Sequence, residues 1–210
     1  MSERVRSFIA ILLDEAVRDA VAAELEYLKP LASSVAWVAR QNLHLTLKFL
    51  GEVEAETLET MKEALAEGVS SAAPFMLAFH GLGAFPGLAR PRVIWVGVSQ
   101  GARECQALQA DVDAALARRG FPKESRPYTP HLTIGRVRVP RGMAALQQAI
   151  TRNAQKDFGT QSLRAISLMR SDLHPSGARY TELYTAPLGP PHLHPLPPHP
   201  ASPHWGEEKR

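Results

Sequence analysis

A chain of 210 residues, 45% of them hydrophobic, is long enough to bury one sizeable core, either as a single compact domain or as two small lobes. Its one cysteine, Cys105, excludes an internal disulfide and suits a reducing cytoplasm. The formal net charge of +3 is compatible with a phosphate-bearing partner without indicating one, and the lack of an apolar run of membrane-spanning length excludes a transmembrane helix.

The hydrophobic pattern predicts alternating strands and helices in the first part of the chain. Residues 7–13 form an apolar run that no signal-peptide cleavage site follows, so we expect a buried first strand. The next predicted elements are a helix over 14–29, a short strand over 35–38, a strand through 43–49 that Gly51 closes, a helix over 55–70 and a strand over 75–79.

The second part repeats this alternation after a loop rich in glycine and proline at 81–87. The predicted elements are a strand over 93–98, a helix over 102–119, a strand over 131–139, a helix over 141–155 and two strands over 161–170 and 178–186. The resulting order, β-α-β-β-α-β followed by β-α-β-α-β-β, is typical of an α+β fold. We therefore expect two related lobes, each an antiparallel sheet covered by helices.

The end of the chain differs in composition from the rest. Residues 187–210 contain eight prolines and four histidines. Polar chain rich in proline cannot bury enough apolar surface to become ordered. We therefore predict a folded domain over 1–186 and a disordered tail over 187–210.

One tetrapeptide pattern occurs twice, as His-Leu-Thr-Leu at 44–47 and as His-Leu-Thr-Ile at 131–134. Side chains at positions i and i+2 of a strand project from the same face, so each His shares a face with its Thr while the apolar residues face a core. Two such strands facing each other would place two imidazoles and two hydroxyls in one cleft. For either copy alone, a polar pair on the solvated face of an amphipathic strand remains the alternative.

Two histidines and two threonines in a cleft are equipped for chemistry at phosphorus. One imidazole can accept the proton of an attacking water while the other donates a proton to the departing oxygen. The threonine hydroxyls can donate hydrogen bonds to the phosphate oxygens. This chemistry requires no metal or cofactor, and neither motif strand offers a carboxylate or thiolate ligand beside its histidine. The chain also lacks a P-loop, a dinucleotide fingerprint and the serine elbow of hydrolases.

The paired motifs resemble those of the 2H phosphoesterase superfamily. The surrounding segments are similar to those of bacterial and archaeal RNA 2′,3′-cyclic phosphodiesterases, also called 2′-5′ RNA ligase-like proteins. The resemblance runs from about residue 5 to 187 and leaves out the tail. Its most specific segments are 42–51, 81–86, 90–97, 129–136 and 171–180.

This resemblance implies a bilobal fold in which two antiparallel sheets with flanking helices surround a central active cleft. It implies hydrolysis of a terminal 2′,3′-cyclic phosphate on RNA or a nucleotide to a 2′-phosphate, and a capacity to join RNA ends through 2′-5′ linkages. The family pattern places His44 and His131 as the acid–base pair and Thr46 and Thr133 on the phosphate. By analogy we assign His44 as the proton donor and His131 as the proton acceptor. Nothing in this scheme demands more than a monomer.

Three further residues are candidates for substrate contact. Arg136 matches a family position that contacts phosphate or a terminal nucleotide, but strict alternation puts it on the face opposite His131 unless a bulge at Gly135 turns it round. Phe49, at the equivalent place after the first motif, can either stack a base or pack in the core. Tyr128 can line an RNA groove. Other residues that can line such a groove are Arg90, Arg92, Trp95 and Arg126.

Two alternatives to an RNA cyclic phosphodiesterase remain open. A protein that binds RNA ends could hold a terminal phosphate in the same cleft without turnover, although complete motifs in both halves favour catalysis. The same chemistry could also serve a small cyclic phosphate or a 2′-5′ oligonucleotide, because such a site reads phosphate geometry more than base identity.

Overall fold

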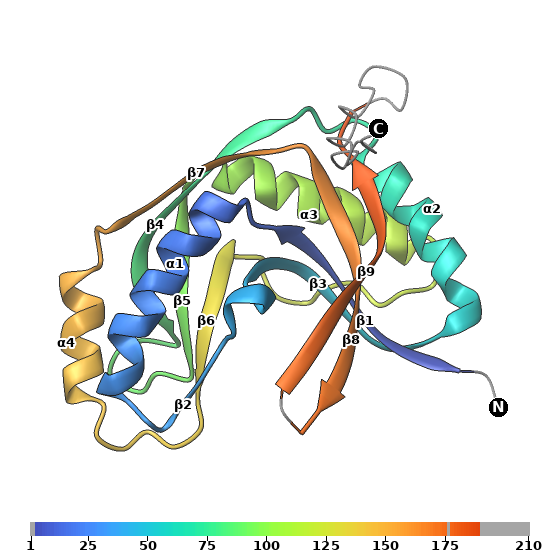
Figure 1. Cartoon of the computed structure of the whole chain (residues 1–210). Coiled ribbons are helices and arrows are strands. Elements are labelled where there is room, and N and C mark those ends of the chain that lie inside the picture. The colour runs from blue at the N-terminus through green and yellow to red at the C-terminus, as the bar shows by residue number, and fades with distance from the viewer. Residues whose placement is uncertain (1–2, 176, 190–210) are drawn as a thin grey trace, which may run out of the picture.

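The structure, a computed structural model, describes residues 3–175 and 177–189 (Figure 1). Its strands are β1 (Arg4–Leu12), β2 (Val35–Trp37), β3 (His44–Glu54), β4 (Phe75–Phe85), β5 (Val93–Gln100), β6 (His131–Val137), β7 (Asp157–Leu163), β8 (Ala165–His174) and β9 (Gly177–Pro187). Its α-helices are α1 (Glu15–Leu28), α2 (Leu58–Val69), α3 (Ala102–Ala117) and α4 (Ala144–Arg152), and short 3-10 turns cover Lys29–Leu31, Arg40–Asn42 and Ala55–Thr57.

The strands form one antiparallel sheet in the order β7-β4-β5-β6-β3-β1-β8-β9, with β2 added to β6. We call β4, β5, β6, β7 and β2 the His131 half, and β1, β3, β8 and β9 the His44 half. The two halves are hydrogen-bonded in register at one position, where Leu45 of β3 faces Leu132 of β6. The α+β class is confirmed. The prediction of two separate sheets is not confirmed, because this pair joins the halves into one curled sheet.

A single core runs across both halves, on the sheet face away from the motif histidines. Leu45, Leu47, Leu132 and Ile134 are buried there, as the two-residue period predicts. Helix α1 packs on β7, whereas α2 packs on α3 and on β9, so each half has its own helical cover (Figure 1). Each fully buried Leu or Ile contributes about 1.5–3 kcal/mol. In the described part of the chain, no helix is long and apolar enough to cross a membrane.

Two strands continue through glycines at which the sequence predicts that they end. Gly51 adopts φ 73°, and the pairing of β1 with β3 shifts register beside it, so β3 continues to Glu54. Gly81 adopts φ 75° beside a register shift in β4, which continues to Phe85. The predictions of a loop over 81–87 and of a strand end at Gly51 are therefore wrong. At both positions a glycine in the left-handed region forms a bulge within the strand.

The predicted strand over 161–170 is two strands that separate at Arg164. Strand β7 pairs with β4 in one half, and β8 pairs with β1 in the other. The fold also reaches beyond residue 186, since the buried Leu188 donates its backbone N–H to the carbonyl of Arg164 at 2.8 Å. The predicted tail thus begins a few residues too early, and its remainder, 190–210, lies outside the described residues.

Candidate active site

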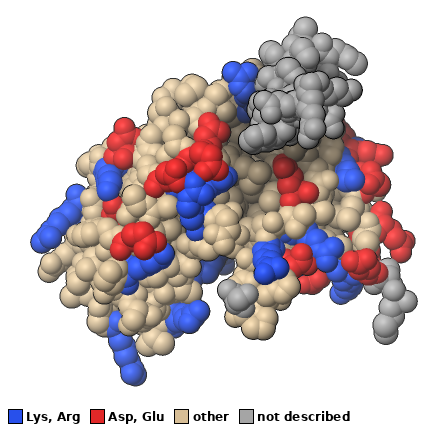
Figure 2. Space-filling model, viewed as in Figure 1, with Lys and Arg blue, Asp and Glu red and all other residues tan. Residues whose placement is uncertain are grey.

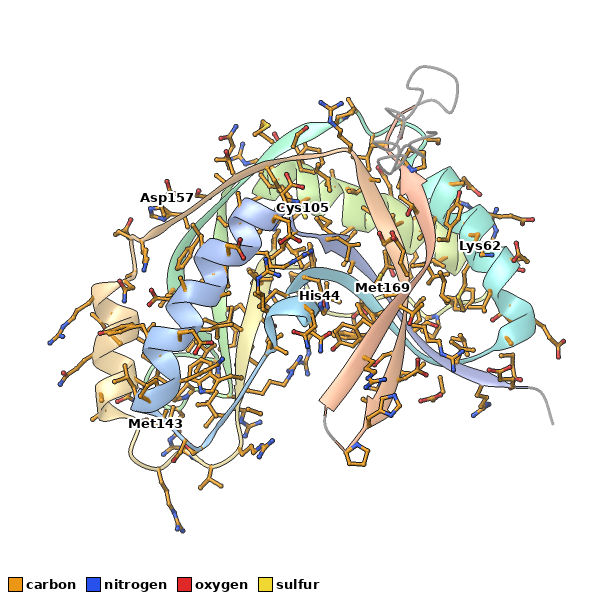
Figure 3. The ribbon with its side chains drawn as sticks, in the orientation of Figure 1. His44, Lys62, Cys105, Met143, Asp157 and Met169 are labelled. Atoms are coloured by element: carbon orange, nitrogen blue, oxygen red, sulfur yellow. The ribbon has the colours of Figure 1, made fainter. Side chains whose placement is uncertain are left out.

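The two motif strands meet at the junction of the halves. Antiparallel pairing through Leu45 and Leu132 sets His44 across from Thr133 and Thr46 across from His131, all on the face opposite the core. Figure 3 shows His44 near the middle of the molecule. The sequence prediction that both motifs share one face of one site therefore agrees with the geometry.

Two adjoining cavities open on this face. The His44 cavity has a volume of about 390 Å³ and the His131 cavity about 480 Å³. The residues that line both cavities are Thr46, Phe49, Thr133 and Arg136. Because each cavity has its own histidine and the two share both threonines, they form one cleft with an imidazole toward either end.

The two imidazoles are held by the same local device. His44 Nδ1 lies 2.7 Å from the carbonyl oxygen of Asn42, and His131 Nδ1 lies 2.7 Å from that of Thr129. A carbonyl oxygen only accepts, so each Nδ1 carries the proton and each Nε2 is left to exchange protons with a substrate. A backbone acceptor two residues before each histidine thus fixes the tautomer that acid–base chemistry requires.

The surroundings of the two rings differ. His44 Nε2 lies 2.9 Å from Thr46 Oγ1, and its ring packs against Phe8 and edge-on against Tyr180, with centroid distances of 4.8 and 5.3 Å. The ring of His131 has one aromatic neighbour, Phe85, edge-on at 5.0 Å among the described side chains. His131 Nε2 has no hydrogen-bond partner among those side chains. The His44 ring is therefore the more enclosed of the two.

The pKa of both histidines lies below its ordinary value. Burial is the main cause, since it disfavours the charged imidazolium, and the positive charge of Arg136 lowers the pKa of each ring further. The hydrogen bonds to the carbonyls of Asn42 and Thr129 oppose these effects in part. Both rings are consequently biased toward the neutral form, which is the form that a general base needs.

A bulge turns Arg136 into the cleft. Along β5 and β6, Ile94 faces Gly135 while the next residue, Trp95, faces Thr133, so β6 holds one extra residue between them. A Cβ on Gly135 would lie 2.8 Å from the side chain of Val35, which explains the glycine there. The exposed Arg136 therefore lines both cavities, as the bulge hypothesis requires.

A similar bulge follows the first motif. Along β1 and β3, Ile9 faces Lys48 while Ala10 faces Thr46, so Leu47 is the extra residue. The alternation is reversed beyond it, and Phe49, which is 58% exposed, joins the lining of both cavities. Of the two alternatives for Phe49, a ring at the cleft surface is the one found.

Lys48 is turned inward by the same bulge. Its Nζ lies 2.5 Å from Asp113 Oδ1 of α3 and donates to the carbonyl oxygen of Pro122 at 2.6 Å. Asp113 also accepts from the backbone N–H of Glu124 at 3.2 Å. This buried pair ties the first motif strand to the segment that leads into the second motif.

Tyr128 has a structural contact as well as a place in the cleft. Its hydroxyl donates to the carbonyl oxygen of Thr46 at 2.9 Å, while the residue lines the His131 cavity. Cys105, labelled in Figure 3, lies 3.9 Å from that hydroxyl through its Sγ. Burial raises the pKa of the Cys105 thiol to about 11, so the thiol stays protonated, as expected for a core residue.

The remaining candidates for an RNA groove lie in three different places. Arg126 lines the His131 cavity, whereas Arg90 and Arg92 line a neighbouring groove on the surface. Trp95 packs on Phe85 at 5.2 Å and is not part of the lining of either cavity. Within residues 3–175 and 177–189, no group of three or more His, Cys, Asp or Glu side chains is placed to hold a metal ion.

Sequence reasoning missed the residues that surround the imidazoles. Phe8 of β1 and Tyr180 of β9 enclose His44, and Phe85 of β4 supports His131. Asn42 donates its side-chain N–H to the carbonyl oxygen of Ala178 at 2.7 Å and so anchors the β8–β9 hairpin beside the motif. The segments of the family resemblance include Asn42, Phe85 and Tyr180, but they do not show these contacts, because the contacts join strands that are distant in sequence.

Comparison with known proteins identifies the family of this chain. The chain belongs to the 2′-5′ RNA ligase superfamily, whose pattern matches residues 15–175. An RNA 2′,3′-cyclic phosphodiesterase of Methanothermobacter thermautotrophicus is 36% identical over 180 residues, covering 86% of this chain and 97% of the relative. One from Aquifex aeolicus is 34% identical over 187 residues, covering 88% and 98%.

A solved structure has a similar overall fold. The crystal structure of E. coli LigT complexed with 3′-AMP matches with a TM-score of 0.70 at 28% identity, covering 89% of this chain and 99% of that one. The family resemblance that the motifs and their flanking segments indicate is therefore confirmed.

Proposed function

We propose that this protein hydrolyses 2′,3′-cyclic phosphate ends of RNA or nucleotides to 2′-phosphates. The observation that carries the proposal is the single cleft in which both motif histidines have Nδ1 fixed by a carbonyl and share Thr46, Thr133 and Arg136 between them. Relatives that align over most of the chain are named RNA 2′,3′-cyclic phosphodiesterases, which supports the same activity.

The proposed reaction moves two protons. His131 Nε2 accepts a proton from water as the water oxygen bonds to phosphorus. The bond between phosphorus and the 3′ oxygen breaks, and His44 Nε2–H protonates that oxygen, leaving a 2′-phosphate and a free 3′-hydroxyl. Exchange with solvent then returns the proton to His44 and removes it from His131. We assign the base to His131 because its Nε2 has no competing hydrogen bond among the described residues.

The shared residues are assigned to the phosphate. Thr46 and Thr133 donate hydrogen bonds to its non-bridging oxygens, and Arg136 supplies the positive charge that stabilises the added negative charge of the transition state. An anionic phosphate between the histidines also raises the pKa of each, which restores the protonated form that the acid His44 needs. Arg136 thus lowers the pKa of the histidines, whereas the bound substrate raises it.

The same cleft can join RNA ends. A 5′-hydroxyl of a second RNA end that takes the place of water attacks the phosphorus, and the same pair of histidines exchanges the same two protons. The product is a 2′-5′ linkage with a free 3′-hydroxyl. We propose that this ligation is a second activity of the site. We also propose that the active protein is a monomer in the cytoplasm.

Phosphorus NMR of the protein incubated with a 2′,3′-cyclic nucleotide, and with RNA ending in a cyclic phosphate, tests the proposal. We expect conversion to the 2′-phosphate, unaffected by EDTA, because each proposed step uses side chains of the chain itself. Tight binding without product would instead favour a protein that only binds RNA ends. Formation of the 3′-phosphate would reverse the assignment of the leaving oxygen.

A further inference from the structure

A basic groove adjoins the His131 end of the cleft. Its volume is about 590 Å³, and we call it the Arg groove; its lining residues are Ala89, Arg90, Pro91, Arg92, Val137, Arg138 and Pro140. It is continuous with the cleft along the chain, because Val93 and Arg136 line the His131 cavity and are paired across β5 and β6. The Arg groove therefore begins one residue beyond the cleft on both strands.

The three arginines of the Arg groove are exposed, and none has a carboxylate partner among the described residues. Some other surface arginines do have such partners: Arg118 and Arg119 both pair with Glu67. Figure 2 shows basic side chains without acidic neighbours along the lower left edge of the view, where β2, β5 and β6 end. Like charges gathered without counter-charges repel one another, and an anionic ligand relieves that repulsion.

Backbone hydrogen bonds hold two of these arginines, Arg92 and Arg138, in place. Arg92 donates its N–H to the carbonyl oxygen of Phe85 at 2.7 Å, and its own carbonyl accepts from Val137 at 2.9 Å. Arg138 donates its N–H to the carbonyl oxygen of Ser34 at 2.9 Å. Guanidinium groups on a fixed backbone lose less conformational freedom when they bind a phosphate than groups on a free loop would.

The opposite end of the cleft is less suited to a second phosphate. The small cavity beyond the His44 cavity is lined by three arginines, Arg4, Arg6 and Arg170, and by the carboxylates of Glu52 and Asp172. Arg4 pairs with Glu54 at 3.2 Å, and Arg170 pairs with Asp172 at 2.8 Å. Among the described residues, Arg6 is the one arginine of that cavity without a carboxylate partner, against three in the Arg groove, so the larger uncompensated charge favours the His131 end as the path of a longer anion.

We propose that the Arg groove binds the phosphate backbone of the RNA strand upstream of its cyclic-phosphate end. The proposal rests on the cyclic phosphodiesterase function and extends it, since it makes an RNA chain, and not a mononucleotide, the preferred substrate. Guanidinium contacts to phosphates carry no sequence information, so the preference is independent of base sequence and weakens with salt.

A triple variant, Arg90→Gln/Arg92→Gln/Arg138→Gln, tests the Arg groove. We expect KM for a short oligonucleotide ending in a 2′,3′-cyclic phosphate to rise about tenfold or more, while kcat and the KM for a 2′,3′-cyclic mononucleotide stay unchanged. Loss of three phosphate contacts also reduces the slope of log KM against log salt for the oligonucleotide by about 2. The matched control, Arg103→Gln/Arg152→Gln/Arg164→Gln, removes the same charge from exposed positions outside the cleft and the Arg groove.

An equal rise of KM in the control variant would overturn the proposal, because net charge alone would then explain it. An unchanged KM for the oligonucleotide in the triple variant would also overturn it. Failure of the wild-type protein to hydrolyse either substrate would overturn the proposed function instead. In that case, fluorescence anisotropy with a labelled oligonucleotide ending in a 3′-phosphate still tests the Arg groove, and equal affinity of wild type and triple variant would refute it.

Discussion

The two halves of the sheet share the same local features around their histidines but contribute different side chains to the cleft. In each, a histidine donates Nδ1–H to the carbonyl two residues before it, a threonine shares its face, and a bulge brings the fifth residue after the histidine into the cleft. That fifth residue is Phe49 in one half and Arg136 in the other. The first half thus adds an exposed ring to the cleft, and the second adds a charge.

The environments of the histidines differ in the same direction. His44 is enclosed by Phe8 and Tyr180 and is hydrogen-bonded to Thr46, whereas His131 faces a more open cavity. A repeated motif therefore fixes which groups are present, and the strands beside it decide how each group is used. This difference is the physical basis on which we assign different roles to two residues of identical local sequence.

The largest effect is expected from removing either histidine. His44→Ala and His131→Ala should each lower kcat for a 2′,3′-cyclic nucleotide by about 10²- to 10⁴-fold, the scale of acid–base catalysis. Steady-state kinetics measures this, with His174→Ala, an exposed position on β8, as the control. Full activity of either cleft variant would contradict the shared mechanism.

The link between the halves can be broken at Lys48. The Lys48→Met change leaves the buried carboxylate of Asp113 without its partner, so the free energy of unfolding should fall by about 3–5 kcal/mol in urea titration. The double variant Lys48→Met/Asp113→Leu removes both charges and should recover much of the loss. A double variant no more stable than the single one would show that the ion pair is not the cause.

The bulge of the second motif can be tested at Gly135. A Cβ there would lie 2.8 Å from Val35 and 2.9 Å from Trp37, so Gly135→Ala should cost about 1–3 kcal/mol by overpacking. We also expect a higher KM, because Arg136 is displaced with the strand. Gly87→Ala, where a Cβ meets nothing within 4 Å, is the control for thermal unfolding and kinetics. An unchanged KM in Gly135→Ala would show that the bulge does not determine the position of Arg136.

The smallest effect should be a shift in pH dependence. Arg136 lowers the pKa of both histidines, so Arg136→Gln should raise both and move the bell-shaped profile of kcat/KM to higher pH. Because burial is the main cause of the lowered pKa values, the wild-type profile should still be centred below the ordinary pKa of histidine. Arg103→Gln is the matched control. An unchanged pH profile in Arg136→Gln would show that the charge of Arg136 does not affect the pKa of either histidine.

Much of the fold and the centre of the site could be predicted because a two-residue period is written directly in the sequence. The period fails at Lys48, which the alternation places beside His44 and Thr46 but which the bulge at Leu47 turns toward α3. A bulge has no pattern of its own in a single sequence, so it is visible only through the residues it displaces.

The surroundings of the site were beyond sequence reasoning for another reason. Phe8 and Tyr180 reach His44 from β1 and β9, and the order of strands in the sheet determines that contact. Local propensity carries no information on which strands become neighbours. The separation of β7 from β8 at Arg164 was missed likewise, because no glycine or proline stands between the two strands and only their different partners distinguish them.

The strand order also has a consequence during synthesis on the ribosome. The His131 half is built from strands between residues 35 and 163, but the His44 half needs β8 and β9 beside β1. Until residues 165–187 emerge, β1 has an unpaired edge and Phe8 lacks its contact with Tyr180. A nascent chain therefore carries both histidines long before it has the enclosed ring of His44, and a prematurely released fragment would be exposed to aggregation through that edge.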